Sequence, residues 1–117
     1  MKTAIDTNII SALWSICGPV YAELLAHPKV KASFVDEFLA AGRIAVDCTL
    51  DAGVWREAGL AFARYAARRR LTPRGEPKRL LVDYVIGAHA SLRADRLLTF
   101  DKPRYVKDFP KLKIAAP

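Results

Sequence analysis

The spacing of apolar residues along the chain predicts short strands that alternate with amphipathic helices. Apolar or branched runs predict strands over residues 3–5, 16–17, 43–48, 97–100 and 113–115. Apolar residues at helical spacing predict helices over residues 9–14, 19–26, 30–39, 50–70 and 80–94. Between the last two helices, Arg68 to Arg79 combines two prolines and a glycine with many basic residues, and this composition predicts a loop.

Strands that alternate with helices favour a parallel sheet covered by helices on both faces, which is a three-layer α/β/α sandwich. The chain has 117 residues, no internal repeat and no linker, so we expect a single domain over residues 1–117. No apolar run reaches the length of about 18 residues that a membrane helix needs, and the N-terminus has no signal-peptide pattern. We therefore expect a cytoplasmic protein.

The first crossover of the predicted sheet is unusually short. Only residues 7–15 are available between Asp6, at the end of the first strand, and Ile16, in the second. A crossover between neighbouring parallel strands needs at least about 10–12 residues including its helix. We therefore hypothesise that the sequence skips a segment between about Leu13 and Ile16. The alternative is a natural deletion with a distorted crossover.

Five of the twelve carboxylates lie in apolar stretches, where an acid is disfavoured unless it is paired or binds a metal. These five are Asp6, Glu23, Asp47, Asp83 and Asp101. Asp6 and Asp101 end predicted strands, so their carboxylates meet at one sheet edge if those strands are neighbours. Asp47 directly precedes a helix start, and we interpret it as a structural acid. The remaining acids, Asp108 among them, lie among polar or charged residues, and we expect them to be solvated.

Clustered carboxylates repel one another, and a hard divalent cation such as Mg²⁺ or Mn²⁺, which prefers oxygen ligands, is the simplest compensation. Removing one acid should therefore relieve repulsion in the metal-free protein. Other chemistries fit poorly, because the sequence has no P-loop, no glycine-rich dinucleotide loop, no zinc-ligand spacing and no nucleophile elbow.

Four short motifs contain four of these acids. They are DTN at Asp6–Asn8, YAEL around Glu23, DYVIGAHA from Asp83 and LLTFDKPRYVKDFPKL from Leu97. In this order they resemble the PIN-domain ribonucleases, and among these the chain is most similar to the VapC toxins of bacterial toxin–antitoxin pairs. The resemblance runs nearly from end to end.

The resemblance implies that Asp6, Glu23, Asp83 and Asp101 form an acidic quartet that binds one or two Mg²⁺ or Mn²⁺ ions. It implies that Asn8 and Thr99 are supporting polar residues. It further implies a parallel sheet sandwiched by helices, metal-dependent endonucleolytic cleavage of RNA, a small VapB-like antitoxin as partner, and a homodimer.

The net charge of +7 indicates a polyanionic partner such as RNA. Basic residues of the loop and the tail are expected to contact RNA phosphates: Arg68, Arg69, Arg70, Arg74, Lys102 and Arg104. For each of them the alternative is a solvated surface position.

Two other functions are compatible with the sequence. One is a non-catalytic RNA- or protein-binding module on the same fold, although four acids among apolar neighbours favour catalysis. The other is a metal-dependent phosphatase or DNA nuclease, because the same metal chemistry cleaves those substrates. Cleavage assays on RNA and DNA, with Mg²⁺ and with EDTA, separate all three.

Overall fold

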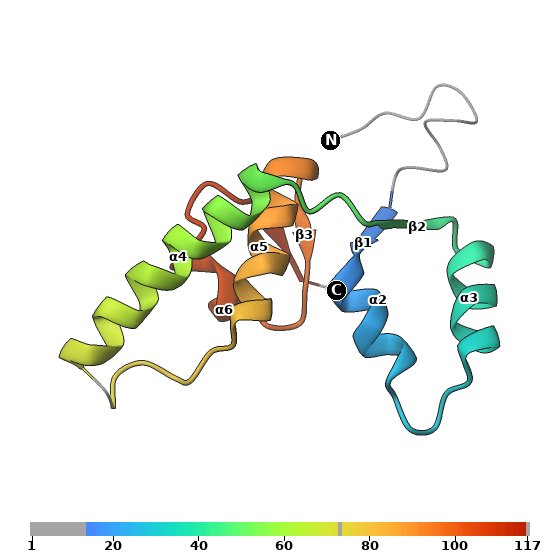
Figure 1. The fold of residues 1–117 in the computed structure, drawn as a ribbon, viewed down its shortest axis with the longest axis horizontal. Helices are drawn as coiled ribbons and strands as arrows, with labels where there is room; N and C mark the ends of the chain where they lie inside the picture. Colours follow the sequence, from blue (N-terminus) through green and yellow to red (C-terminus); the bar gives the residue numbers. More distant parts are fainter. Residues whose placement is uncertain (1–13, 73, 117) are drawn as a thin grey trace. The chain divides into compact units, whose positions relative to one another are not determined.

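The computed structural model describes residues 14–72 and 74–116 (Figure 1). It divides into two compact units with a boundary between Thr49 and Leu50, and each unit has its own small parallel sheet. The mixed α/β class and the parallel pairing of strands are therefore confirmed. The expected strand over residues 3–5, together with Asp6 and Asn8, lies outside the described residues, and the single domain over residues 1–117 stays a prediction.

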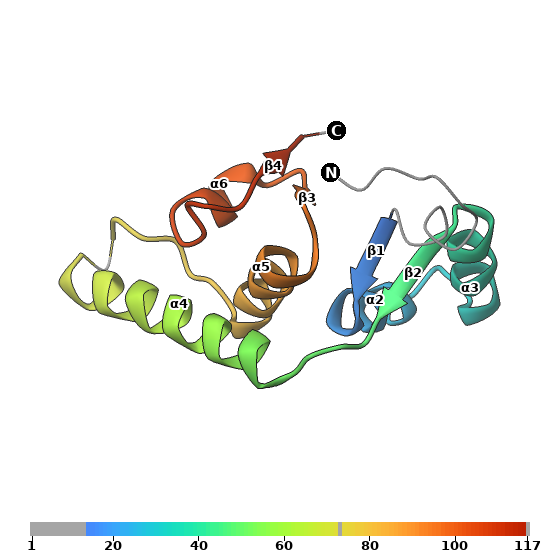
Figure 2. The same ribbon diagram turned by 90° about the horizontal axis from the view of Figure 1, so that it is seen from above.

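The described residues of the first unit, 14–49, form two parallel strands and two helices. Its elements are β1 (Trp14–Cys17), α2 (Gly18–Leu25), α3 (Ala32–Ala41) and β2 (Ile44–Asp47). The strands pair in register from Trp14 with Ile44 to Cys17 with Asp47, and Figure 2 shows them side by side. Helix α2 follows β1 without a loop, because Pro19 supplies a backbone angle that suits the first helical turn.

The second unit is built on a helical hairpin. Its elements are α4 (Ala52–Leu71), α5 (Leu81–Arg93), β3 (Leu97–Leu98), α6 (Lys102–Val106) and β4 (Ile114–Ala115). Helix α4 packs against α5, and β3 pairs in parallel with β4 (Figure 1). The side chain of Asp51 caps α4 by accepting a hydrogen bond of 3.1 Å from the backbone N–H of Val54.

Aromatic rings fill the core between α4 and α5. The Tyr84 ring is fully buried, and its centroid lies 5.2 Å from that of Phe62, 5.6 Å from that of Tyr65 and 6.2 Å from that of Phe109. Small residues on α4, Ala58 and Ala61, are also buried and let the two helices approach closely. The core of the second unit therefore depends on ring packing next to small side chains.

A buried ion pair borders this aromatic core. Asp108, expected to be solvated, is only 5% exposed, and that expectation was wrong. Its Oδ1 lies 2.8 Å from Arg68 Nη2, and its Oδ2 accepts a hydrogen bond of 3.1 Å from the Tyr84 hydroxyl. Arg68 also donates to Glu76 at 3.0 Å. Burial, with Asp108 nearby, raises the pKa of the Tyr84 phenol well above its ordinary value.

Most predicted elements are present, with two corrections. Trp14 was predicted to end a helix but belongs to β1, because its backbone pairs with that of Ile44. Arg68 to Arg70 were included both in the predicted helix over residues 50–70 and in the predicted loop, and they form the last turn of α4, where basic side chains favour the negative end of the helix dipole. The loop therefore begins after Leu71 and not at Arg68. The skipped segment hypothesised near Leu13 stays a prediction, because that residue lies outside the described part of the chain.

Two further expectations can be compared with the structure. Asp47 Oδ1 accepts a hydrogen bond of 2.9 Å from the backbone N–H of Thr49, which fits a structural acid in the turn after β2. The helix start expected directly after Asp47 was wrong, because α4 begins at Ala52 and Asp51 caps it. No helix among residues 14–72 and 74–116 is both long and apolar enough to cross a membrane.

Gly87 marks the closest approach of α5 to the tail of the second unit. A Cβ atom at this position would lie 2.7 Å from Cδ2 and Cζ of the buried Phe109 ring. We expect Gly87→Ala to lower the free energy of unfolding by about 1–3 kcal/mol, because the core has no room for the displaced ring. Urea unfolding measures this change.

Gly59→Ala is the matched control. A Cβ at Gly59, in the middle of α4, meets nothing within 4 Å. This substitution should raise the free energy of unfolding by about 0.5–1 kcal/mol, because alanine favours the helix. Equal effects of the two substitutions would contradict close packing at Gly87.

Candidate functional site

Asp83 and Asp101 meet at the side chain of Arg104. Arg104 Nη1 donates a hydrogen bond of 3.2 Å to Asp83 Oδ1, and Arg104 Nε lies 3.1 Å from Asp101 Oδ2. One guanidinium therefore compensates two carboxylates that are well separated in the sequence. We refer to Asp83 and Asp101 as the acid pair.

The first turn of α5 positions Asp83. Its Oδ2 accepts a hydrogen bond of 3.0 Å from the backbone N–H of Leu80, the residue that precedes the helix. A carboxylate is favourable here, because the N-terminus of a helix carries partial positive charge. The side chain is 13% exposed, so Asp83 faces solvent through a small opening only.

The turn between β3 and α6 positions Asp101. The backbone N–H of Asp101 donates to Thr99 Oγ1 at 3.1 Å, and Asp101 Oδ1 accepts from the backbone N–H of Arg104 at 3.3 Å. Asp101 thus caps α6 while Thr99 fixes the turn before it. The Asp101 side chain is 41% exposed, which leaves this carboxylate accessible to a ligand.

A second cation lies beside the acid pair. Arg79 Nη1 is 3.8 Å from Asp101 Oδ2, and the Arg79 side chain is 17% exposed. Arg104 and Arg79 together reduce the repulsion between the carboxylates. Burial, with the negative charge of Asp83 adding to it, raises the pKa of the neighbouring Tyr105 phenol.

The acid pair has the kind of ligand atom that a hard cation binds. Carboxylate oxygens are the ligands that Mg²⁺ and Mn²⁺ prefer, and Asp101 is accessible. Arg104, however, holds an oxygen of each carboxylate, so a metal ion would have to displace its guanidinium. No group of three or more His, Cys, Asp or Glu residues within the described ranges is placed to hold a metal. The acid pair can therefore supply only part of a ligand set.

The other predicted metal ligands are located as follows. Glu23 is exposed on α2, in the first unit, whereas Asp83 and Asp101 belong to the second. Asp6, with the supporting residue Asn8, lies outside the described residues. The structure thus brings together two of the four acids, and the complete quartet stays a prediction.

The basic residues predicted to bind RNA have different surroundings. Arg68 is engaged by Glu76 and Asp108, and Arg104 by the acid pair. Arg69 is half-buried, while three others are exposed: Arg70, Arg74 and Lys102. The exposed residues are available to a polyanion, whereas the charge of Arg68 is already balanced.

Sequence reasoning did not identify Arg79 and Arg104 as counter-ions of the acid pair. The spacing of Asp101 and Arg104 was a usable signal, because residues three apart at the start of a helix are neighbours. Arg79 offered no such signal, since it is one of many cations in a basic segment and lies 22 positions before Asp101.

Comparison of the chain with protein-family models, with curated proteins and with solved structures found no match.

Proposed function

We propose that this chain is a metal-dependent endoribonuclease of the VapC type, with a PIN-like three-layer sandwich around a central parallel sheet. The observation that supports this most strongly is the acid pair: two carboxylates from separate motifs share one guanidinium, and one of them is open to solvent. Asp6 and Glu23 would complete the ligand set for Mg²⁺ or Mn²⁺. When bound, the ion would supply Lewis acidity toward water and toward the RNA phosphate.

The protein's own residues have separate tasks in this proposal. Asp101, the more exposed acid, would orient the attacking water, while Asp83, fixed by Leu80, would serve as a rigid ligand. Arg104 is 38% exposed and can turn from the acids to a phosphate oxygen once a cation replaces it. Arg79 would hold a neighbouring phosphate beside Asp101.

Protein partners are part of the same proposal. Phe34 and Phe38 stack on α3 with ring centroids 6.4 Å apart, and each is 59% exposed. Exposed aromatic side chains of this kind are typical of protein interfaces. They support a small VapB-like antitoxin or a second copy of the chain as the partner.

A non-catalytic binding module is the second candidate function, and one observation favours it. Every carboxylate oxygen of the acid pair already has a protein partner: a backbone N–H or an arginine. In this second candidate function, the acid pair caps α5 and α6 and has no catalytic role. Cleavage and metal binding distinguish this structural role from the catalytic one.

Asp101→Asn is expected to abolish metal-dependent RNA cleavage, because the amide is a poorer ligand and a poorer base than the carboxylate. The assay follows a labelled single-stranded RNA with Mg²⁺ and with EDTA. Glu57→Gln, the same acid-to-amide change at a half-buried position of α4 outside the acid pair, should leave cleavage unchanged. Full cleavage by purified Asp101→Asn would exclude the proposed mechanism.

The structure also revises the expected stability of this variant. Asp101→Asn was expected to relieve repulsion, but Arg104 and Arg79 already compensate the carboxylate. The variant should therefore be slightly less stable than wild type in EDTA, by about 1 kcal/mol or less, because the ion pairs are partly exposed. An increase in stability would indicate uncompensated repulsion at the acid pair.

Arg104→Gln tests the metal site without an activity assay. We expect this variant to lose about 1–2 kcal/mol of stability in EDTA, because the acid pair loses its shared counter-ion. Mg²⁺ or Mn²⁺ should then raise its Tm more than it raises the wild-type Tm, since no guanidinium competes for the carboxylates.

Lys111→Gln, an exposed lysine outside the acid pair, is the matched control and should respond to Mg²⁺ as wild type does. If Mg²⁺ and Mn²⁺ change the Tm of Arg104→Gln no more than that of wild type, the acid pair does not bind the metal.

A further inference from the structure

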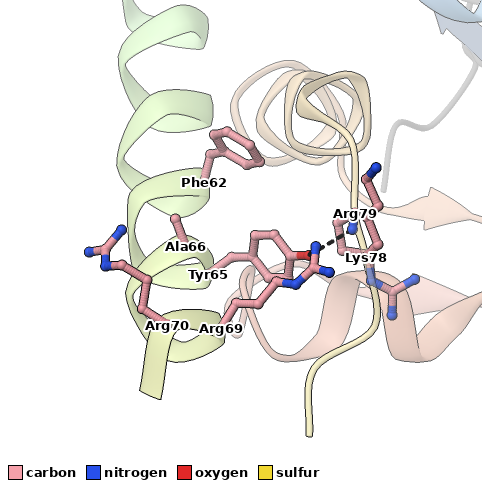
Figure 3. Close-up of a pocket in the computed structure, with 7 residues that line it drawn as sticks. All are labelled: Phe62, Tyr65, Ala66, Arg69, Arg70, Lys78 and Arg79. Carbon is pink, nitrogen blue, oxygen red and sulfur yellow. Dashed lines mark hydrogen bonds between the residues drawn. The ribbon is translucent and has the colours of Figure 1, made fainter. Parts of the chain in front are cut away.

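A hollow of about 410 Å³ lies between the second half of α4 and the segment that leads into α5 (Figure 3). We call it the α4 hollow. The residues that line it are Phe62, Tyr65, Ala66, Arg69, Arg70, Lys78 and Arg79. The first five come from α4 and the last two from the extended segment, so the hollow belongs entirely to the second unit.

The lining of the α4 hollow is strongly cationic. Four of its seven residues carry a positive charge, and none is an acid. Arg70 and Lys78 are exposed and form no ion pair with any residue in the ranges 14–72 and 74–116. Arg68, one position before Arg69, differs because Glu76 and Asp108 neutralise it. The excess of positive charge indicates an anionic ligand.

Apolar surface of α4 forms the other part of the lining. Phe62 and Ala66 are half-buried and lie one helical turn apart. The Phe62 ring packs against Tyr84 and Tyr65, with centroid distances of 5.2 and 5.9 Å, so its position is fixed. A flat apolar wall beside several cations matches a ligand that has both an aromatic ring and a phosphate.

The Tyr65 hydroxyl holds the two sides of the hollow together. It donates a hydrogen bond of 2.8 Å to the carbonyl oxygen of Pro77 and accepts one of 2.7 Å from the backbone N–H of Arg79. It also accepts from Arg69 Nη1 at 3.3 Å. The segment that carries Lys78 and Arg79 is therefore fixed to α4 before any ligand binds, which lowers the entropy cost of binding.

We propose that the α4 hollow binds a nucleoside phosphate within single-stranded RNA. The base lies against Phe62 and Ala66, and the phosphate lies among Arg69, Lys78 and Arg79. Arg79 is also 3.8 Å from Asp101, so a nucleotide in the hollow is next to the acid pair. The role of the hollow in presenting RNA for cleavage rests on the proposed function, whereas binding itself requires neither a metal ion nor catalysis.

Ala66→Glu tests the proposal, because it places a carboxylate in the hollow on a helix-compatible side chain. Affinity is measured by fluorescence anisotropy with a labelled eight-nucleotide RNA in EDTA. We expect a loss of about tenfold or more, since one base contact and the phosphate attraction are removed together.

The matched control is Ala63→Glu, which makes the same change in total charge at an exposed position of α4 outside the hollow. It should reduce affinity by less than about threefold, through the general charge effect alone. Equal losses for the two variants would overturn the proposal.

Lys78→Ala provides a test that does not depend on folding of a helix variant, because Lys78 is exposed and lies outside any helix. The slope of log affinity against log salt should become shallower by about 0.7, the value for one phosphate contact to a single strand. An unchanged slope together with unchanged affinity would overturn the placement of the phosphate.

Small probes distinguish RNA from a free nucleotide as the ligand. Adenosine monophosphate should compete with the labelled RNA more strongly than inorganic phosphate, and both should bind more weakly than the eight-nucleotide RNA. If phosphate competes as well as adenosine monophosphate, the apolar wall contributes nothing and the proposal fails. If the mononucleotide binds as tightly as the RNA, the ligand is a free nucleotide, and the assignment to RNA is wrong.

The binding assays are paired with the cleavage assay on the wild-type protein. Tight RNA binding by wild type that depends on Ala66 and Lys78, together with no RNA cleavage by wild type in Mg²⁺ or Mn²⁺, would leave the hollow supported and the proposed ribonuclease function unsupported. Cleavage of RNA by wild type, together with unaltered RNA binding by Ala66→Glu and Lys78→Ala, would support the ribonuclease function and would exclude the α4 hollow as the RNA site.

Discussion

The candidate site depends on a single guanidinium. Asp83 lies in the first turn of α5 and Asp101 caps α6, so both carboxylates stabilise helix starts while they repel each other. Arg104 resolves this conflict by contacting both, at 3.2 and 3.1 Å. Arg104 lies on α6, and Asp101 caps that helix. Asp101 therefore helps to position the guanidinium that compensates its own charge. The metal ion proposed for this site would take over the same task.

The aromatic core of the second unit holds these helices in place. Tyr84 follows Asp83 in α5 and is buried against rings from α4 and from the tail, so the first turn of α5 has little freedom. The Tyr84 hydroxyl contacts Asp108, whose other oxygen contacts Arg68 at the end of α4. An unpaired buried carboxylate would cost several kcal/mol, so this network favours one arrangement of α4 relative to α5.

Sequence patterns predicted the helices and strands well where the periodicity of apolar residues alone determines the secondary structure. The long helix after Thr49 and the helix that contains Asp83 were both recognised, and so were the short strands within the described residues. The sequence patterns did not predict burial or pairing of a side chain where contacts between distant residues determine it. Asp108 has polar neighbours in the sequence and is buried because Arg68, 40 positions earlier, pairs with it. The convergence of Asp83 and Asp101 was predicted, but a metal ion was expected where the structure has Arg104, because periodicity does not show which basic residue faces an acid.

In the proposed ribonuclease, the acid pair would bind a divalent cation in exchange for Arg104. A crystal structure of the protein soaked in Mn²⁺, with anomalous scattering recorded, tests this most directly. We expect an anomalous peak within bonding distance of a carboxylate oxygen of both Asp83 and Asp101, with the Arg104 guanidinium moved away from them. Arg104 still bound to both carboxylates in a Mn²⁺-soaked crystal, with no peak between them, would contradict it.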